Sequence, residues 1–195
     1  MSATKRHLCF GIALIFLMIG DLWSKSVVFE LVSKQPSPRS GPYDLYKNPP
    51  YRGPYYPILT TNPGLQFFAS YNKGVTFGMF GEYNLKYFFI LFCLVAFGVL
   101  VKLYLEKEPR LVLTKAIFPF RIALLLVASG ALGNMTDRFF YVGVRDFISV
   151  YLVYNQERYH YPTFNVADSY IVTGIIILVL LNLFCAKPQV KESVK

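Results

Sequence analysis

Four long apolar stretches restrict what this chain can fold into. They cover about residues 8–32, 86–105, 117–138 and 166–186 of the 195-residue sequence. Each stretch is long enough to cross the roughly 30 Å hydrocarbon core of a bilayer as a helix. A helix also pairs the backbone groups that lipid leaves without partners. The sequence therefore predicts an all-α membrane protein with four transmembrane helices.

The composition supports the same class. The chain is 54% hydrophobic and only 16% charged, whereas soluble domains carry about 25% charged residues. Its length suits one compact unit and is too short for two ordinary domains. We expect a single integral membrane domain over residues 1–195, with long outer loops at 33–85 and 139–165. The first stretch is expected to be a retained helix, because no small-residue cleavage site follows it.

The orientation follows from the basic residues beside the four stretches. One side of the membrane receives the denser set, which comprises Lys5, Arg6, Lys102, Lys107, Arg110, Lys115, Lys187, Lys191 and Lys195. Basic loops remain in the cytoplasm, so both termini are expected there and the two long loops outside. Topology thus explains the net charge of +9. We expect no nucleic-acid binding, because no basic stripe is interleaved with stacking aromatics.

The first outer loop has two parts. The Pro- and Tyr-rich segment "SPRSGPYDLYKNPPYRGPYYP" has no regular period and is typical of irregular loop. The following "GLQFFASYNKGVTFGMF" alternates and has a turn-forming "NKG" in its middle, which favours a short hairpin. The three cysteines have no partner at metal-ligand spacing, so neither a metal, a cofactor nor a disulfide is expected.

Polar residues from separate parts of the chain converge on the outer side. Ionisable groups within or beside a membrane are usually functional, which makes this convergence a candidate site. At 1.5 Å per residue, the first of these acids lies about 20 Å from the cytoplasmic start of its helix. The converging residues are Asp21, Asn134, Asp137, Arg138, Asp146 and Asp168.

Each of these residues also has a purely structural interpretation. Asp21 and Lys25 have the i, i+4 spacing of an ion pair within a helix. Asn165 could cap the fourth helix, and Asp168 would then favour the helix dipole. Asp146 could be an ordinary loop acid. These interpretations do not explain why all the groups gather on one side.

The third stretch allows a similar choice. Asn134, Asp137 and Arg138 share one helix face and could form a polar packing cluster, because Gly130 and Gly133 permit close helix contact. The outer face offers no Ser-His-Asp or Cys-His set, so paired carboxylates are the available enzyme chemistry. The alternatives are a small transporter or proton relay, and an assembly subunit whose polar groups lock helices together.

Five short motifs, in order, resemble the lipoprotein signal peptidases (signal peptidase II, peptidase family A8). Each alone is weak, but the ordered set on a four-span scaffold is specific. The family patterns are D-x-x-S/T-K, N-x-G-x-x-F-G, G-N-x-x-D-R, V-x-D-F and F-N-x-A-D. They correspond here to "DLWSK" (21–25), "NKGVTFG" (72–78), "GNMTDR" (133–138), "VRDF" (144–147) and "FNVAD" (164–168).

The resemblance implies a fold and a set of site residues. The fold would be four transmembrane helices with a small outer β-cradle and an outer amphipathic helix. The catalytic pair would be Asp146 and Asp168, whereas Asp137 lies in a motif without belonging to that pair. The substrate-binding or supporting residues would be Asp21, Lys25, Asn72, Gly74, Asn134, Arg138 and Asn165.

The resemblance also implies an activity. The protein would be an aspartic endopeptidase of the bacterial inner (cytoplasmic) membrane that cuts diacylglyceryl-modified prolipoproteins just before the lipid-modified Cys. Its only other expected partners are membrane lipids, and we expect a monomer with its active site near the outer leaflet. Two neighbouring carboxylates would share a proton and activate a water. The sequence does not assign that proton to either aspartate.

Some positions depart from the family pattern. Gly143 lies one residue nearer Asp146 than the usual glycine, and Tyr161 stands where the family often has Trp. The segment between the two aspartates is slightly long, and residues 34–61 look like an insertion. These departures affect the loops that would cover a substrate and leave the aspartate pair in place.

Overall fold

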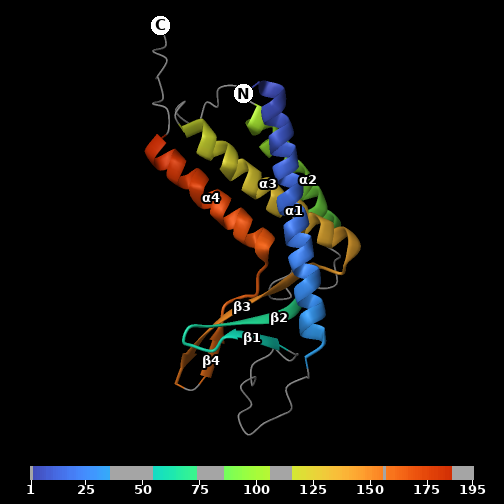
Figure 1. Cartoon of the computed structure of the whole chain (residues 1–195), viewed down its shortest axis with the longest axis vertical. Helices are drawn as coiled ribbons and strands as arrows, with labels where there is room; N and C mark the ends of the chain where they lie inside the picture. Colours follow the sequence, from blue (N-terminus) through green and yellow to red (C-terminus); the bar gives the residue numbers. More distant parts are fainter. Residues whose placement is uncertain (1, 36–54, 74–85, 106–115, 156, 186–195) are drawn as a thin grey trace.

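The computed structural model describes residues 2–35, 55–73, 86–105, 116–155 and 157–185. It contains four helices, each long and apolar enough to cross a membrane. They are α1 (Ala3–Ser33), α2 (Lys86–Leu105), α3 (Ile117–Phe140) and α4 (Val166–Cys185), which confirms the four predicted spans (Figure 1). The first and third helices extend slightly beyond their predicted ends.

The helices pack around α3, which contacts each of the other three. Its closest neighbour is α4, because glycines remove side chains from the contact. A Cβ on Gly130 would collide with the carbonyl oxygen of Ala167, and one on Gly174 would lie 2.8 Å from the carbonyl oxygen of Ala123. Large apolar side chains such as Phe16 and Leu183 point outward and are exposed. This outward-facing apolar surface suits lipid.

A four-stranded antiparallel sheet lies beyond one end of α3 and α4 and beside the last turns of α1 (Figure 1). Its strands are β1 (Tyr55–Leu59), β2 (Gly64–Asn72), β3 (Val144–Tyr154) and β4 (Glu157–His160). They lie side by side in sequence order, so β2 and β3 pair across more than seventy residues of chain. The small outer sheet that was predicted is therefore present.

The sheet takes up more of the outer loops than predicted. Tyr55–Leu59 begins in the segment expected to be irregular, and β3 and β4 form a hairpin in the expected loop 139–165. β2 pairs with β1 and β3, and the hairpin predicted around "NKG" extends past Lys73, outside the described residues. The described residues contain no helix besides the four spans, and the amphipathic helix stays a prediction.

The chain just before α4 is fastened to β3. The backbone N–H groups of Phe147 and Ile148 both donate to the carbonyl oxygen of Phe164, at 3.0 and 2.8 Å. The N–H of Phe164 donates in return to the carbonyl oxygen of Ile148, at 3.1 Å. On the other side, Phe147 packs with Val28 and Val32 of α1. These contacts hold the start of α4 beside the start of β3.

Candidate active site

Asn165 begins α4 and forms a reciprocal cap with Asp168. The side-chain Oδ1 of Asn165 accepts the backbone N–H of Asp168 at 2.9 Å. The carboxylate of Asp168 accepts the backbone N–H of Asn165 at 3.1 Å. This exchange satisfies two of the N–H groups that a helix start leaves without partners. The capping role predicted for Asn165 is confirmed, and it fixes the position of Asp168.

The same amide reaches the second predicted aspartate. Nδ2 of Asn165 donates to Asp146 at 2.7 Å and to Oδ1 of Asn134 at 3.2 Å. Nδ2 of Asn134 donates in turn to Asp168 at 2.7 Å. Two asparagines from different helices thus hold the two carboxylates. We refer to Asp146 and Asp168 as the aspartate pair.

Lys25 lies at the buried side of this arrangement. Its Nζ is 2.7 Å from Asp21, 3.3 Å from Asp137 and 3.0 Å from Oδ1 of Asn134. The predicted ion pair of Asp21 and Lys25 is therefore present. Asp21 also accepts the backbone N–H of Ala167 at 2.9 Å, which places a negative charge at the start of α4. Both Asp21 and Lys25 are fully buried.

Arg145 completes the ionic contacts, and the sequence did not mark it as a site residue. Its Nε and Nη2 donate to one carboxylate oxygen of Asp137 at 3.1 and 2.9 Å, and its backbone N–H donates to the other at 2.9 Å. Nη1 donates to the hydroxyl of Ser26 at 3.1 Å. The guanidinium lies 4.2 Å from the ring centre of Tyr141. The available signal was its position beside Asp146 on an alternating strand.

The charges of these groups divide into two sets. Four buried side chains form what we call the ion cluster, which comprises Asp21, Lys25, Asp137 and Arg145. Two negative and two positive charges make it neutral. The aspartate pair has no cation within ion-pairing distance among the described residues. Its carboxylates are held by neutral amides, which cannot balance two negative charges.

The pKa of Asp146 reflects this difference. Burial, followed by the nearby charge of Asp168, raises the pKa of Asp146 to about 6 from the usual 3.8. Hydrogen bonds from Asn72 and Asn165 and the charge of Lys25 act in the opposite direction but are outweighed. Asp146 therefore keeps a proton at a pH where exposed aspartates have lost theirs.

Three predicted site residues remain to be placed, which are Asn72, Gly74 and Arg138. Asn72 ends β2, where it pairs with Val144 in register and bonds the carboxyl of Asp146 through its side chain. Arg138 faces away, with its guanidinium 5.1 Å from the ring centre of Phe89 and Nη1 3.3 Å from the carbonyl oxygen of Asn134. Gly74 lies outside the described residues. The structure thus brings Asn72 to the pair and places Arg138 beside α2.

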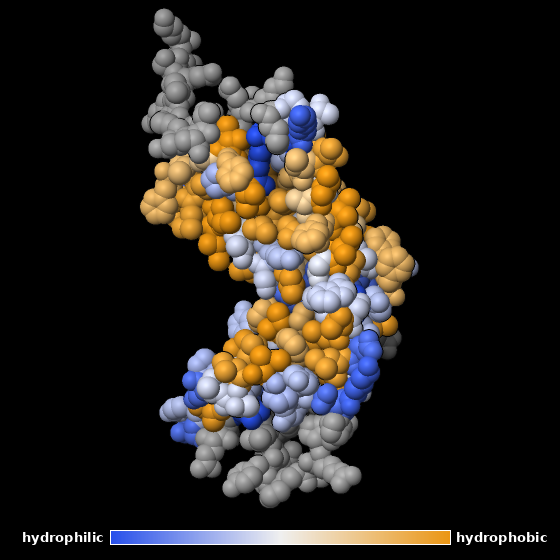
Figure 2. Space-filling view, in the orientation of Figure 1, coloured by the Kyte–Doolittle hydropathy of each residue, from blue (hydrophilic) through white to orange (hydrophobic). Residues whose placement is uncertain are grey.

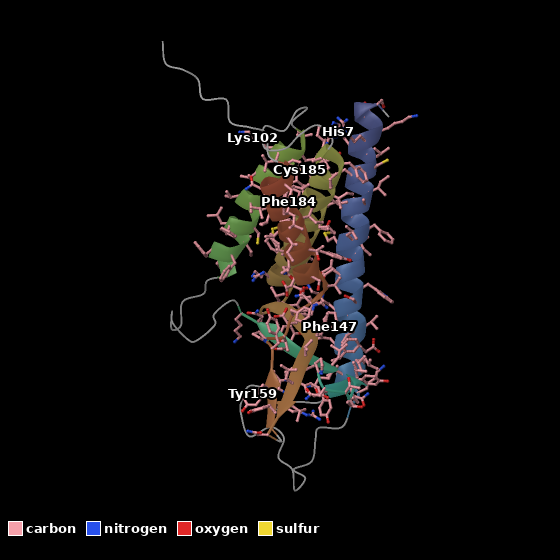
Figure 3. The ribbon with its side chains drawn as sticks, turned by 90° about the vertical axis from the view of Figure 1, so that its left-hand side faces the viewer. His7, Lys102, Phe147, Tyr159, Phe184 and Cys185 are labelled. Atoms are coloured by element: carbon pink, nitrogen blue, oxygen red, sulfur yellow. The ribbon has the colours of Figure 1, made fainter. Side chains whose placement is uncertain are left out.

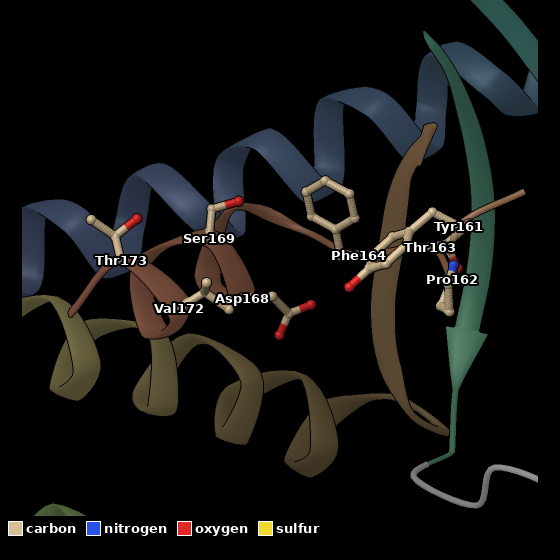
Figure 4. Close-up of a pocket in the computed structure, with 8 residues that line it drawn as sticks. All are labelled: Tyr161, Pro162, Thr163, Phe164, Asp168, Ser169, Val172 and Thr173. Atoms are coloured by element: carbon tan, nitrogen blue, oxygen red, sulfur yellow. The ribbon is translucent and has the colours of Figure 1, made fainter. Parts of the chain in front are cut away.

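A groove of about 450 Å³ opens beside Asp168. Figure 2 shows the molecule hollowed on one side between the helices and the sheet, with apolar surface on both flanks. Asp168 projects into the space between α4 and the preceding loop (Figure 4). The groove is lined by Tyr161, Pro162, Thr163, Phe164, Asp168, Ser169, Val172 and Thr173. An extended apolar chain could therefore reach Asp168.

The sheet also contains a serine and histidine in contact. Oγ of Ser149 lies 3.1 Å from Nδ1 of His160. Ser149 is fully buried, so no substrate reaches its hydroxyl, and strand alternation directs it away from the face of Asp146. Burial, followed by the charge of Arg158, lowers the pKa of His160. This pair supports the sheet, and the aspartate pair is the candidate site at the groove.

Comparison with known proteins places the chain in a family. The family Signal peptidase (SPase) II matches residues 12–184. A lipoprotein signal peptidase from Chlamydia felis is 41% identical over 63% of this chain and 67% of its own length. The one from Borrelia hermsii is 30% identical over 94% of this chain and 95% of its own.

Solved structures agree at the level of the fold. A bacterial membrane enzyme superposes with a TM-score of 0.61 at 20% identity, over 96% of this chain and 94% of its own. A second structure of a bacterial membrane enzyme gives a TM-score of 0.62 at 20% identity, over 90% and 93% of the two chains. Four apolar spans, an outer sheet and the family match over most of the chain lead to one conclusion: this multi-pass bacterial membrane protein belongs to the signal peptidase II family.

Proposed function

We propose that this protein is an aspartic endopeptidase that removes the signal peptide from diacylglyceryl-modified prolipoproteins, cutting just before the lipid-modified Cys. Its relatives are lipoprotein signal peptidases, which supports this substrate class. The observation that carries the proposal is the aspartate pair: two carboxylates with no ion-pairing cation among the described residues, held by Asn165 beside an apolar groove. This arrangement suits water activation between two acids.

The two aspartates have different surroundings and different roles. Asp146 is buried, and its raised pKa makes it the member that holds the shared proton. Asp168 lines the groove, where its carboxylate can accept a proton from a water. A water in the groove donates one proton to Asp168 while its oxygen attacks the scissile carbonyl carbon. Asp146 donates its proton to the carbonyl oxygen, which gives a neutral gem-diol.

The second half of the reaction restores both acids. The gem-diol collapses when one hydroxyl returns its proton to Asp146 and the C–N bond breaks. The departing nitrogen takes the proton held by Asp168. The products are a carboxylic acid at the end of the signal peptide and a free amine on the modified Cys. Asn165 and Asn134 keep the two carboxylates in place throughout, since each bonds one of them directly.

The position of the site supports a substrate that is itself in the membrane. Asp168 lies in the first turn of α4, and Asp137 lies in the last turn of α3. The exposed aromatics Phe139, Phe140 and Tyr141 follow at the same end, and aromatic side chains favour the membrane interface. A scissile bond near that surface would meet the pair while its lipid chains remained in the bilayer.

The placement in the cell follows the basic residues. Lys5 and Arg6 lie at the start of α1 and Lys102 at the end of α2. These positions support cytoplasmic termini and an aspartate pair at the outer leaflet of the inner membrane. A transporter would instead spread polar groups along the whole path through the membrane. The cytoplasmic halves of α2 and α4 are almost wholly apolar. We propose that the protein works as a monomer, because one chain supplies both carboxylates.

The decisive experiment replaces each aspartate of the pair separately. Asp146→Asn and Asp168→Asn keep the side-chain shape and remove the acid. Each is expected to lower the rate of precursor cleavage by about 10³-fold, seen as lipid-modified precursor accumulating in membranes. Glu30→Gln is the matched control, because Glu30 is an acid on α1 whose carboxylate forms an exposed ion pair with Lys34. A folded variant of either aspartate that cleaves at the normal rate would refute the proposal.

A further inference from the structure

A second group of polar side chains, two of them arginines, lies at the opposite end of the helices from the sheet. It consists of Arg6 and His7 of α1, Tyr104 of α2 and Arg121 of α3. Figure 3 shows His7 and Lys102 at this end, and Phe147 and Tyr159 at the other. Arg121 precedes Asn134 by thirteen positions on α3, which is about 20 Å along the helix. We call Arg6, His7, Tyr104 and Arg121 the basic cluster.

Tyr104 organises the basic cluster. It is buried, and its hydroxyl donates to the carbonyl oxygen of Arg6 at 3.2 Å. The ring of His7 meets it edge-on at 5.5 Å between centres. The guanidinium carbon of Arg121 lies 5.7 Å from the ring centre. Three helices thus bring the backbone of Arg6, the imidazole of His7 and the guanidinium of Arg121 to one aromatic ring.

The cations of the basic cluster have no anion beside them in the described part of the chain. Nε of Arg6, Nε of Arg121 and Nδ1 of His7 are shielded from solvent without a hydrogen-bond partner. The charges of Arg6 and Arg121 are close enough to repel each other. Arg145, by contrast, makes three hydrogen bonds to Asp137. A shielded N–H group without a partner is costly, and an anion bound beside these groups would remove that cost.

We propose that the basic cluster binds the phosphate group of an anionic phospholipid. A phosphate offers several acceptor oxygens and a negative charge, which suits two guanidinium groups with free N–H donors. The surroundings favour a lipid over a soluble phosphate. Arg121 lies within a span. Leu8, which follows His7 on α1, and Phe118 and Ile122, which lie near Arg121 on α3, are exposed apolar residues suited to acyl chains. Basic pockets between helices on the cytoplasmic side typically bind lipid headgroups.

The test uses the full-length protein in neutral detergent, titrated with phosphatidylglycerol or phosphatidylcholine, with binding followed by native mass spectrometry. The wild type is expected to prefer phosphatidylglycerol. Arg121→Gln is expected to weaken that binding by about tenfold or more, as loss of a charge-assisted hydrogen bond predicts. The matched control is Lys102→Gln, which removes an exposed positive charge at the same end. It is expected to change binding by less than about fivefold.

A second variant and a second ligand keep the result decisive. Arg6 lies in the first turns of α1, so Arg6→Gln tests the same basic cluster if Arg121→Gln does not fold. Glycerol phosphate distinguishes the two sources of phosphate, and it is expected to compete only weakly. Equal weakening by Lys102→Gln, or no preference for phosphatidylglycerol, would overturn the proposal. If glycerol phosphate competes as strongly as phosphatidylglycerol binds, the basic cluster binds phosphate without its acyl chains, and the choice of a lipid is wrong.

Discussion

The ion cluster and the aspartate pair lie side by side, but they differ in how their negative charges are balanced. Asp137 in the ion cluster contacts both Lys25 and Arg145. Asp146 in the aspartate pair receives only amide hydrogen bonds from its direct partners, Asn165 and Asn72. Two cations balance the charge of Asp137, whereas Asp146 has a raised pKa. Under the proposed function, aspartates thus support the fold in the ion cluster and carry the chemistry in the aspartate pair.

The difference also shows how one cluster depends on the other. Asn134 connects them, because its Oδ1 accepts from Lys25 at 3.0 Å and its Nδ2 donates to Asp168 at 2.7 Å. A neutral ion cluster fixes the orientation of this amide without adding net charge to the pair. Two further negative charges there would make ionisation of the pair harder. We therefore expect a substitution in the ion cluster to lower the stability of the fold. A substitution in the aspartate pair should instead change how the pair binds its proton.

The largest expected effect comes from removing the central cation. Lys25→Met leaves Asp21 and Asp137 buried beside each other with one cation fewer. It is expected to lower the free energy of unfolding by about 3–5 kcal/mol, the usual cost of breaking a buried ion pair. Thermal unfolding in detergent micelles measures this loss.

Lys34→Met is the matched control for that change. Lys34 forms the other i, i+4 ion pair of α1, with Glu30, and both side chains are exposed. Exposed pairs contribute little, so the melting temperature should hardly move. If the two lysine variants unfold at the same temperature, the ion cluster does not stabilise the fold as argued.

The second prediction concerns the pH dependence of stability. Folded Asp146 keeps its proton up to about pH 6, whereas the unfolded chain releases it near the usual 3.8. Wild-type stability therefore includes a term that falls by about 3 kcal/mol as pH rises from about 4 to about 6. Asp146→Asn removes this term. The variant is expected to gain stability relative to wild type over that range and to keep the gain above it.

Asp137→Asn gives the opposite result if the two clusters differ as described. It removes an acid that balances Lys25 and Arg145, so it is expected to lose about 3–5 kcal/mol at neutral pH. Unfolding of the three proteins in micelles from pH 4 to pH 8 measures both effects. A loss of stability in Asp146→Asn at pH 8 that matches the loss in Asp137→Asn would contradict the distinction.

The helices and the cap of α4 were predictable because their signals are local. Long apolar stretches mark the spans, and Asn165 and Asp168 are three residues apart, so their cap could be proposed from spacing alone. The five motifs then supplied the resemblance from which Asp146 and Asp168 were chosen as a pair. The site assignment remains a prediction, but the structure brings both carboxylates to one amide.

The parts that were missed depend on contacts distant in sequence. β1 begins with "YYP" in a Pro- and Tyr-rich segment, and only pairing with β2 makes it a strand. Arg145 looked like one of several basic residues in an outer loop. Its burial follows from the register of β3, which directs its side chain towards Asp137 at the end of α3. The local sequence alone does not distinguish a basic residue in a loop from one in a buried ion cluster.

The smallest expected effect tests how a single hydrogen bond tunes the proton of the pair. The side chain of Asn72 bonds the carboxyl of Asp146 and lowers its pKa against the larger effect of burial. Asn72→Ala therefore raises this pKa further, so Asp146 holds its proton to a higher pH. The alkaline limb of kcat/KM, which reports loss of that proton from the free enzyme, is expected to move to higher pH. The plateau rate should stay within about tenfold of wild type, because both carboxylates remain.

The control is Asn62→Ala, because Asn62 supports the same sheet without touching the pair. Its side chain exchanges two hydrogen bonds with the backbone of Val153, at 2.8 and 2.9 Å. Initial rates of precursor cleavage across pH, in one detergent, compare the two variants with wild type. Asn62→Ala should leave the limb in place even if it lowers the rate. An unmoved limb in Asn72→Ala, or equal displacement in both variants, would show that the amides around Asp146 only position the carboxyl and do not set its proton affinity.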